Sequence, residues 1–162
     1  MSTIAEATEA DAEGIAAVFA PYATDSVVTF ETTPPTAAQW RTKIRESAWP
    51  FLVLVEDGEI RGYALATPWR PKPAYRYSVE TTIYLAPEAA GRGHGRRLLD
   101  ELLKRCAAAG ARQAIAVVVD SGNPASRNLH RAAGFTDAGV LRRVGFKHDR
   151  WLDTLLLQRE LG

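Results

Sequence analysis

Apolar residues recur along the chain in two spacings, one typical of strands and one typical of helices. Runs that alternate or are continuously apolar predict strands, and Asp57-Gly58 between two such runs predicts a hairpin turn. The predicted strands span residues 3–6, 51–56, 60–67, 77–85, 114–119, 135–140 and 151–158. The run over residues 114–119 has no polar member, which is typical of a strand covered on both faces.

Helical spacing marks further segments, each with a start or a stop signal. Two candidate capping boxes, an asparagine-proline pair and two glycines supply these signals. The predicted helices start after Thr8-Glu9-Ala10-Asp11, after Thr36-Ala37-Ala38-Gln39, near Arg92 and at Asn123-Pro124, and the last two end at Gly110 and Gly134. The helix that starts after Thr36-Ala37-Ala38-Gln39 is expected to carry Trp40, Ile44 and Ala48 on one face.

The order of these elements predicts the fold class. Antiparallel hairpins come first, followed by a strand, a helix, a parallel strand, a second helix and further strands. This order favours an α/β or α+β fold around a mixed sheet flanked by helices. No repeat or low-complexity linker interrupts the sequence, so we expect a single domain over residues 1–162.

Composition narrows the functional classes only a little. The 162 residues carry a net charge of +1, which gives no bulk electrostatic reason to expect a nucleic-acid or membrane partner. Cys106 is the only cysteine and lies in an apolar helical pattern, so a buried structural thiol is expected and a disulfide framework is excluded. No apolar span or secretory signal is found, no metal-ligand spacing is present, and a cytosolic location is expected.

A glycine-rich loop between a predicted strand and a predicted helix is the main candidate for chemistry. Gly91, Gly93 and Gly95 let the backbone approach a ligand closely, and the helix start offers unpaired N–H groups that suit a phosphate. Arg92 and Arg96 add positive charge beside it. We interpret the loop as a cradle for a pyrophosphate.

Other ligands for this loop are less consistent with the sequence. A Walker phosphate loop requires a lysine and then serine or threonine after the last glycine, but Gly95 is followed by two arginines. A dinucleotide fingerprint requires Gly-x-Gly-x-x-Gly in a βαβ unit, whereas these glycines alternate and follow antiparallel strands. A glycine-rich turn without any ligand remains the alternative for the loop taken alone.

The loop and a second motif together resemble the GNAT superfamily of N-acetyltransferases. Gly93 and Gly95 match the superfamily's Gln/Arg-x-x-Gly-x-Gly/Ala loop, although Ala90 stands at the Gln/Arg position. Residues 123–135 resemble its later motif, Asn-x-x-Ala/Ser-x-x-Leu-Tyr-x-x-x-Gly-Phe, with His130 in place of the tyrosine. The resemblance implies a mixed sheet with splayed parallel strands, and acetyl-CoA as cosubstrate without a metal.

Motifs spread over nearly the whole chain resemble the phosphinothricin and methionine sulfoximine acetyltransferase family. They are Phe30-Glu31-Thr32-Thr33-Pro34-Pro35-Thr36, Pro68-Trp69-Arg70-Pro71, Ala74-Tyr75-Arg76, Val79-Glu80 and Gly145-Phe146-Lys147-His148 with Trp151 and Asp153. This resemblance implies transfer of an acetyl group to the amine of a small amino acid such as phosphinothricin, methionine sulfoximine or methionine sulfone. It also suggests a homodimer, with Trp151 and the C-terminal strand region as candidates for the interface.

The chemistry of acetyl transfer assigns roles to the matched residues. The amine must lose a proton, the developing oxyanion needs donors, and the departing thiolate benefits from a proton. Glu80 matches the family's catalytic glutamate and is the candidate base, directly or through a water. A backbone N–H near Tyr84 or Leu85 is the candidate oxyanion donor, and His130 is expected to protonate the thiolate or to bond the sulfur region.

The remaining candidates fall into two groups. Those for the cofactor are Ile83, Tyr84, Leu85, Gly91, Arg92, Gly93, His94, Gly95, Arg96, Asn123, Ser126 and His130. Those for the acceptor are Phe30, Trp69, Tyr75, Arg76 and Tyr77, with Arg76 as the expected carboxylate partner. The rival functions are acetylation of another amine (a peptide N-terminus, a polyamine or an antibiotic) and a non-catalytic CoA-binding module.

Overall fold

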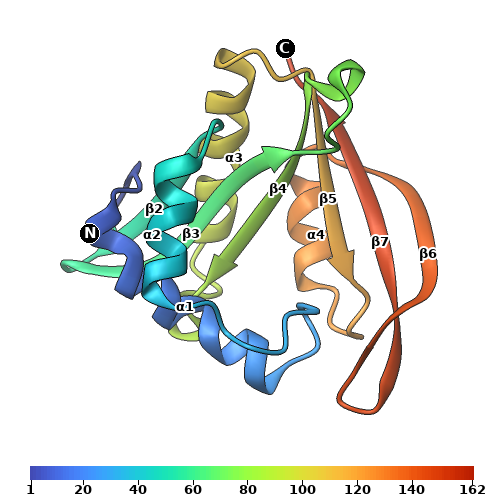
Figure 1. The fold of residues 1–162 in the computed structure, drawn as a ribbon, viewed down its shortest axis with the longest axis horizontal. Helices are drawn as coiled ribbons and strands as arrows, with labels where there is room; N and C mark the ends of the chain where they lie inside the picture. Colours follow the sequence, from blue (N-terminus) through green and yellow to red (C-terminus); the bar gives the residue numbers. More distant parts are fainter.

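The computed structural model describes residues 1–162 and places seven strands in one sheet (Figure 1). The strands are β1 (Ser2–Glu6), β2 (Phe51–Glu56), β3 (Glu59–Pro68), β4 (Ser78–Leu85), β5 (Gln113–Val119), β6 (Thr136–Lys147) and β7 (Arg150–Glu160). The helices are α1 (Ala12–Asp25), α2 (Ala37–Glu46), α3 (His94–Ala108) and α4 (Ala125–Ala132), with short 3-10 turns at Glu9–Asp11, Pro73–Tyr75 and Pro87–Ala89.

The sheet has the order β1-β2-β3-β4-β5-β7-β6, and only β4 and β5 run parallel. Their ladder begins at Ser78 opposite Gln113 and ends at Thr81 opposite Ala116. Beyond this point β4 still pairs with β3 and β5 still pairs with β7. The two central strands therefore separate over their C-terminal halves, and the predicted mixed sheet with splayed parallel strands is confirmed.

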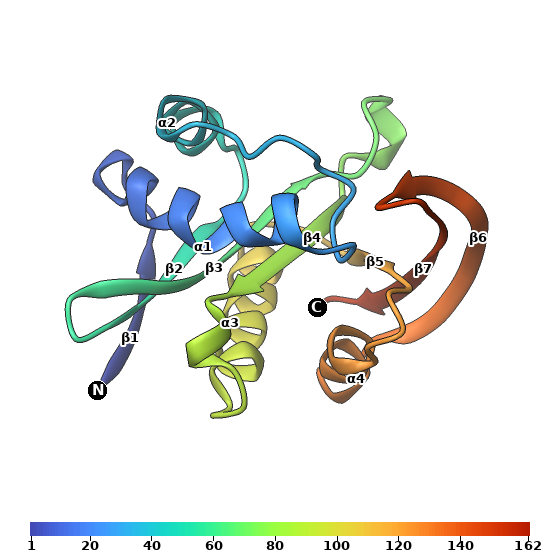
Figure 2. The ribbon, with the colours of Figure 1, turned by 90° about the horizontal axis from the view of Figure 1, so that it is seen from below.

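Helices cover both faces of the sheet, with α1 and α2 on one side and α3 and α4 on the other (Figure 2). The core under α1 and α2 is rich in aromatic side chains, including Phe19, Trp40 and Tyr63. The core under α3 is built mainly from leucine and alanine, and it includes Cys106, whose burial raises the pKa of the thiol to about 12. None of the four helices combines the length and apolarity that a bilayer span requires.

A local signal in the sequence fixes the start of α2. The Thr36 hydroxyl accepts a hydrogen bond from the Gln39 N–H at 3.1 Å and caps α2, as predicted. At the other end, Ser47 is extended, so α2 stops at Glu46 and Ala48 lies outside the helix. The prediction that Ala48 belongs to the helical face is wrong because the chain turns toward β2 before reaching it.

The hairpin of β6 and β7 is longer than predicted. Register shifts between Asp137 and Gly139 and between Leu141 and Gly145 interrupt the pairing, and Arg143 has a φ of 52°. These bulges break the alternation that marks a strand, so sequence pattern alone missed residues 141–147. A turn with positive φ at His148 and Asp149 connects the two strands.

The second strand of the parallel pair also departs from expectation. Residues 114–119 were predicted to be covered on both faces, but Val117 is 39% exposed. The reason is that β4 leaves β5 after Thr81, so that the later residues of β5 border an opening in the sheet. The apolar run reflects a ligand-facing surface as well as core packing.

Candidate active site

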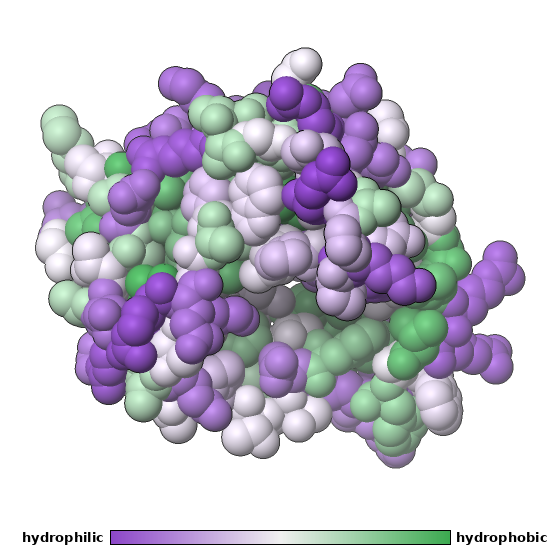
Figure 3. Space-filling view, turned by 45° about the horizontal axis from the view of Figure 1, so that its top comes forward, coloured by the Kyte–Doolittle hydropathy of each residue, from purple (hydrophilic) through white to green (hydrophobic).

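A pocket of about 820 Å³ occupies the opening between β4 and β5. The molecular surface is hollowed near the middle of the view in Figure 3. The residues that line the pocket come from both sides of the sheet. Trp40 and Tyr63 belong to the α1 and α2 side, whereas Ser126 and Leu129 belong to α4. The pocket therefore passes through the sheet rather than lying on one face.

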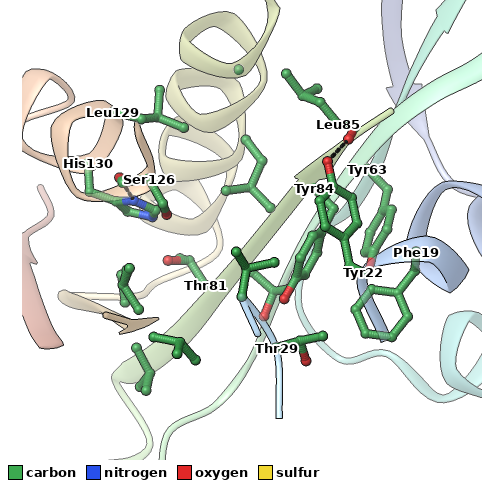
Figure 4. Close-up of a pocket in the computed structure, with 18 of the residues that line it drawn as sticks. Phe19, Tyr22, Thr29, Tyr63, Thr81, Tyr84, Leu85, Ser126, Leu129 and His130 are labelled. Carbon is green, nitrogen blue, oxygen red and sulfur yellow. Dashed lines mark hydrogen bonds between the residues drawn. The ribbon is translucent and has the colours of Figure 1, made fainter. Parts of the chain in front are cut away.

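Strand β4 separates the two halves of the pocket (Figure 4). Because side chains alternate along a strand, Glu80, Thr82 and Tyr84 share one face and residues 81, 83 and 85 share the other. Tyr84 packs with the aromatic core under α1, and Leu85 packs against the core under α3. All six of these residues line the pocket. Two ligands can thus approach one another from opposite faces of the sheet.

The backbone of β4 also offers free groups to the pocket. The Ala86 N–H donates to Arg61 O at 2.8 Å, which directs residue 86 toward β3. Backbone direction alternates along a strand, so the N–H groups of Ile83 and Leu85 point away from β3 into the opening. The Leu85 carbonyl, which points to the same side, accepts a hydrogen bond from the Tyr22 hydroxyl at 2.5 Å.

The glycine loop places another set of free donors at the far end of the pocket. Gly91 and Gly93 have φ of 79° and 81°, angles that a side chain would strain. Neither N–H donates to a backbone carbonyl, and α3 begins directly afterwards at His94. Gly91, Gly93, Gly95 and Arg96 all line the pocket. These donors at a helix N-terminus fit a pyrophosphate.

Two predicted cofactor residues lie outside the pocket. The Arg92 guanidinium makes two hydrogen bonds to the Glu56 carboxylate, at 2.8 and 3.0 Å. His94 is buried, with its Nε2 atom 3.5 Å from Glu56 Oε2. The structure thus brings both residues to the end of β2, where they hold the glycine loop from behind rather than face a ligand.

Glu80 lines the acceptor side of the pocket and is partly buried. Its neighbours across the sheet are Thr67 on β3 and Ile115 on β5. Burial raises the pKa of Glu80, and the positive charges of Arg70 and Lys43 oppose that rise. A carboxylate with a raised pKa is a better proton acceptor, which suits a general base.

His130 lines the opposite side and is 3% exposed. Its Nδ1 atom lies 2.7 Å from the Ser126 carbonyl oxygen, so Nδ1 carries a proton and donates it. Burial lowers the pKa of His130, which favours the neutral ring with an unprotonated Nε2. This geometry fits an Nε2 that accepts a hydrogen bond better than a ring that protonates a thiolate.

Unpartnered hydroxyls and a helix cap complete the cofactor side. Thr81 and Thr154 line the pocket, and their buried hydroxyls have no hydrogen-bond partner within the chain. Asn123 also lines it, and its side-chain oxygen accepts from the Ala125 N–H at 3.0 Å. Asn123 thus lies one residue ahead of Pro124, the N-cap residue of α4, and its side chain bonds the first residue of the helix, while the two orphan hydroxyls are free to bond a polar ligand.

Of the predicted acceptor residues, only Phe30 lines the pocket. Trp69, Tyr75, Arg76 and Tyr77 belong to the loop between β3 and β4, outside the pocket lining, and Arg76 stacks on Tyr77 with its guanidinium carbon 4.5 Å from the ring centroid.

An aromatic wall takes their place; sequence reasoning, which assigned its member Tyr84 to the cofactor, missed it. We call the aromatic wall the pocket-lining rings Phe19, Tyr22, Trp40, Tyr63 and Tyr84. Tyr63 and Tyr84 are direct neighbours on β3 and β4, with ring centroids 5.8 Å apart. The strand register would have revealed this pair, but register cannot be read from one strand alone. Lys43 on α2 also lines this side.

No group of three or more His, Cys, Asp or Glu side chains is arranged to hold a metal ion. The polar groups that converge on the pocket are backbone amides, hydroxyls, the carboxylates of Glu31 and Glu80 on the acceptor side, the cations of Lys43 and Arg96, the Asn123 amide and the His130 ring. This donor set fits an elongated ligand with a diphosphate at one end and an amine-bearing partner at the other.

Comparison with known proteins agrees with this geometry. The chain matches the Acetyltransferase (GNAT) family over residues 15–135. It is 44% identical to the phosphinothricin N-acetyltransferase of Alcaligenes faecalis over 99% of this chain and 83% of that protein. It is 34% identical to the L-methionine sulfoximine/L-methionine sulfone acetyltransferase of Pseudomonas paraeruginosa over 99% of this chain and 95% of that protein.

A solved structure gives the same answer. A GNAT superfamily phosphinothricin acetyltransferase from Sinorhizobium meliloti, in complex with AcCoA, superposes with a TM-score of 0.94 at 42% identity. The match covers 99% of this chain and 89% of that chain. The resemblance expected from the sequence motifs is confirmed. The chain belongs to the GNAT acetyltransferases and is an N-acetyltransferase close to the phosphinothricin and methionine sulfoximine acetyltransferases.

Proposed function

We propose that the protein acetylates the amino group of a small amino acid such as phosphinothricin, methionine sulfoximine or methionine sulfone. The observation that carries the proposal is the pocket through the sheet, which joins the free amides of the glycine loop to Glu80. The relatives named for these substrates align over nearly the full chain. The enclosing aromatic wall also favours a small acceptor over a peptide.

Acetyl-CoA supplies the acetyl group as a thioester whose carbonyl carbon is open to attack by an amine. We assign its diphosphate to the amides of Gly91 to Arg96, and its thioester arm to Ile83, Leu85 and Ser126. Glu80 then takes the proton that the acceptor's ammonium must lose before attack. The Leu85 N–H faces the opening and holds the thioester oxygen as negative charge develops on it. Collapse of this tetrahedral intermediate breaks the C–S bond, and CoA leaves as the thiol once its sulfur has gained the proton that the attacking nitrogen gives up.

The acceptor's carboxylate requires a cation on the aromatic side of the pocket. Arg76 was the expected partner, but it lies off the pocket. Lys43 is the basic residue among the lining residues of α1, α2 and the loop between them, and it makes no ion pair within the chain. We assign the carboxylate to Lys43, and the side-chain end of the acceptor to the aromatic wall and Phe30.

We also propose a homodimer that works in the cytosol. Exposed apolar side chains gather on β6 and β7, along the right-hand side of Figure 3, and these are Val140, Leu141, Val144, Phe146 and Trp151. A patch of this kind commonly marks an interface. Sedimentation of the protein, and of a Trp151→Asp variant expected to shift it toward monomer, tests the assembly.

The function is tested in two steps. Isothermal titration with CoA measures donor binding, and release of free CoA thiol then measures turnover over a panel of amino acids, peptides, polyamines and antibiotics. We expect turnover with the sulfoximine, sulfone and phosphinic amino acids. Turnover with peptides or polyamines alone would show that the acceptor is not a small amino acid. CoA binding without turnover on any amine would show that the protein binds CoA without catalysing acetyl transfer.

A further inference from the structure

Neither acetyl-CoA binding nor proton transfer by Glu80 gives a role to the motif Gly145-Phe146-Lys147-His148. Within it, side chains alternate: Gly145 and Lys147 are buried, whereas Phe146 is 54% exposed. The two inward residues contact the segment between α1 and α2, which has no regular secondary structure. That segment supplies Val28, Thr29, Phe30 and Glu31 to the pocket lining.

Lys147 holds the backbone of this segment. Its ammonium donates to three carbonyl oxygens: Glu31 at 2.6 Å, Thr29 at 2.9 Å and Tyr22 at 3.3 Å. An ammonium has three donors and no acceptor, so these bonds use its full capacity. Lys147 lies in the edge strand β6 but is only 5% exposed, so its side chain is directed toward the protein interior and not toward water. It joins the end of α1 to the loop that follows.

Gly145 seats the ring of Phe30. A Cβ atom placed on Gly145 would lie 2.1 Å from Phe30 Cζ and within 2.5 Å of two further ring atoms. Gly145 has an ordinary backbone conformation, because it is absent from the residues with positive φ. The position therefore needs a glycine for the space that it leaves to the Phe30 ring, and not for its own dihedral angles.

From these contacts we propose that Gly145 and Lys147 are positioning residues that set the width of the acceptor pocket. Lys147 fixes the backbone of residues 29–31, and Gly145 fixes the ring of Phe30 against β6. The pair thereby determines which acceptor side chains fit beneath Phe30. This proposal deepens the proposed function and rests on it, since it concerns the acceptor half of the same pocket.

The test of Gly145 is a double-mutant cycle. Gly145→Ala is expected to raise the acceptor KM about tenfold or more, because the displaced ring narrows or distorts the pocket. The KM for acetyl-CoA is expected to stay within about twofold. If Gly145 acts through Phe30, the same substitution has little further effect in a Phe30→Ala background. Equal effects in both backgrounds would overturn the proposal.

Gly14→Ala is the matched control for crowding. Its Cβ would lie 2.5 Å from Ile60 Cγ1, a comparable clash away from the pocket. It is expected to lower stability without changing either KM. A panel of acceptors of increasing side-chain length sharpens the result, because Phe30→Ala should favour the longer ones relative to wild type.

Lys147 is tested with Lys147→Met and Lys147→Arg, and with Lys104→Met as control because Lys104 is exposed and makes no ion pair. The methionine variant is expected to raise the acceptor KM, while Kd for CoA stays unchanged and arginine restores part of the loss. Hydrogen exchange gives a readout without turnover: amides of residues 26–33 should exchange faster in Lys147→Met, and those of residues 94–103 should not.

These outcomes separate the two proposals. A protein that binds CoA but acetylates no amino acid removes the proposed function, and the exchange experiment still decides whether Lys147 orders the loop. Conversely, the enzyme can be active on amino acids while neither Gly145→Ala nor Lys147→Met changes the acceptor KM. That result would contradict the positioning role and leave the proposed function intact. Loss of CoA binding in step with acceptor binding would show a general folding defect and would also contradict the proposal.

Discussion

The two halves of the pocket are built in different ways. The cofactor half uses mainly backbone amides from one continuous stretch, the end of β4 and the glycine loop into α3, together with α4 and the Thr154 hydroxyl of β7. The acceptor half uses side chains from α1, α2, β3, β4 and the intervening loop, and that loop is held in place by β6. Backbone recognition is local in sequence and tolerates side-chain change, whereas side-chain recognition depends on distant elements.

This contrast predicts that substitutions on the acceptor side alter acceptor kinetics alone, while substitutions in the glycine loop alter CoA binding alone.

The largest expected effect is that of Glu80→Gln. Loss of the proton acceptor should lower kcat by about 10²–10⁴-fold, with the Kd for CoA unchanged. Single-turnover rates and CoA titration check this. Glu160→Gln, at an exposed carboxylate on β7, is the matched control, and full turnover by Glu80→Gln would remove the base assignment.

The pH profile tests the same residue. Because burial raises the pKa of Glu80 above its ordinary value of 4.5, the active carboxylate is lost as pH falls through this raised pKa. The acid limb of log kcat/KM should therefore lie above pH 4.5 and should be absent in Glu80→Gln. His130→Gln separates the two titrating groups, since a limb that persists in this variant does not belong to the histidine.

Lys43→Met should weaken the acceptor's carboxylate contact. A charge-assisted contact of this kind is worth about 10–100-fold in binding, so the acceptor KM should rise by that factor. The KM for acetyl-CoA should not change, and Lys104→Met should change neither. A rise of both KM values by the same factor would mean that Lys43 does not belong to the acceptor half alone.

Gly93→Ala should act on the other half. Gly93 has a φ of 81°, where an L side chain costs about 1–2 kcal/mol, so the loop should relax away from its donor geometry and weaken CoA binding about tenfold. Gly58→Ala is the matched control, with a φ of 78° in the β2–β3 turn and no neighbouring atoms to meet. It should lower stability by a similar amount and leave CoA affinity as it is.

The smallest expected effect is that of Glu56→Gln. The carboxylate holds Arg92 behind the glycine loop, and that guanidinium is half-exposed, so the pair is screened by water. CoA affinity should fall by at most about fivefold, with acceptor kinetics unchanged. Isothermal titration with CoA at low and high salt checks this prediction, because the difference in CoA affinity between wild type and variant should shrink as the salt concentration rises. A larger loss would mean that Arg92 contacts the cofactor itself.

The same contrast explains what could be predicted from sequence. The glycine loop follows from a local motif, whereas the splayed strand and the role of Glu80 follow from the family resemblance that such motifs carry, and the structure places Gly91, Gly93, Gly95 and Glu80 around one pocket. The aromatic wall could not be derived, because it depends on the register of Tyr63 against Tyr84 and on helices packing from elsewhere.

Two further differences have the same cause. Arg76 lies four residues before Glu80 in sequence, but a 3-10 turn at Pro73–Tyr75 and exposure of the loop direct it away from the pocket. Arg92 lies between two pocket glycines, yet it turns back to Glu56 because that carboxylate at the end of β2 is within reach. Neither partner can be recognised from spacing along the chain.

The central claim is that donor and acceptor enter from opposite faces of the sheet and meet at the opening between β4 and β5. Initial rates over a grid of acetyl-CoA and acceptor concentrations test it most directly. Simultaneous occupancy predicts double-reciprocal lines that intersect, and no acetylated enzyme when acceptor is withheld. Parallel lines together with a stable acetyl-enzyme would contradict the account, because they require the first product to leave before the acceptor binds.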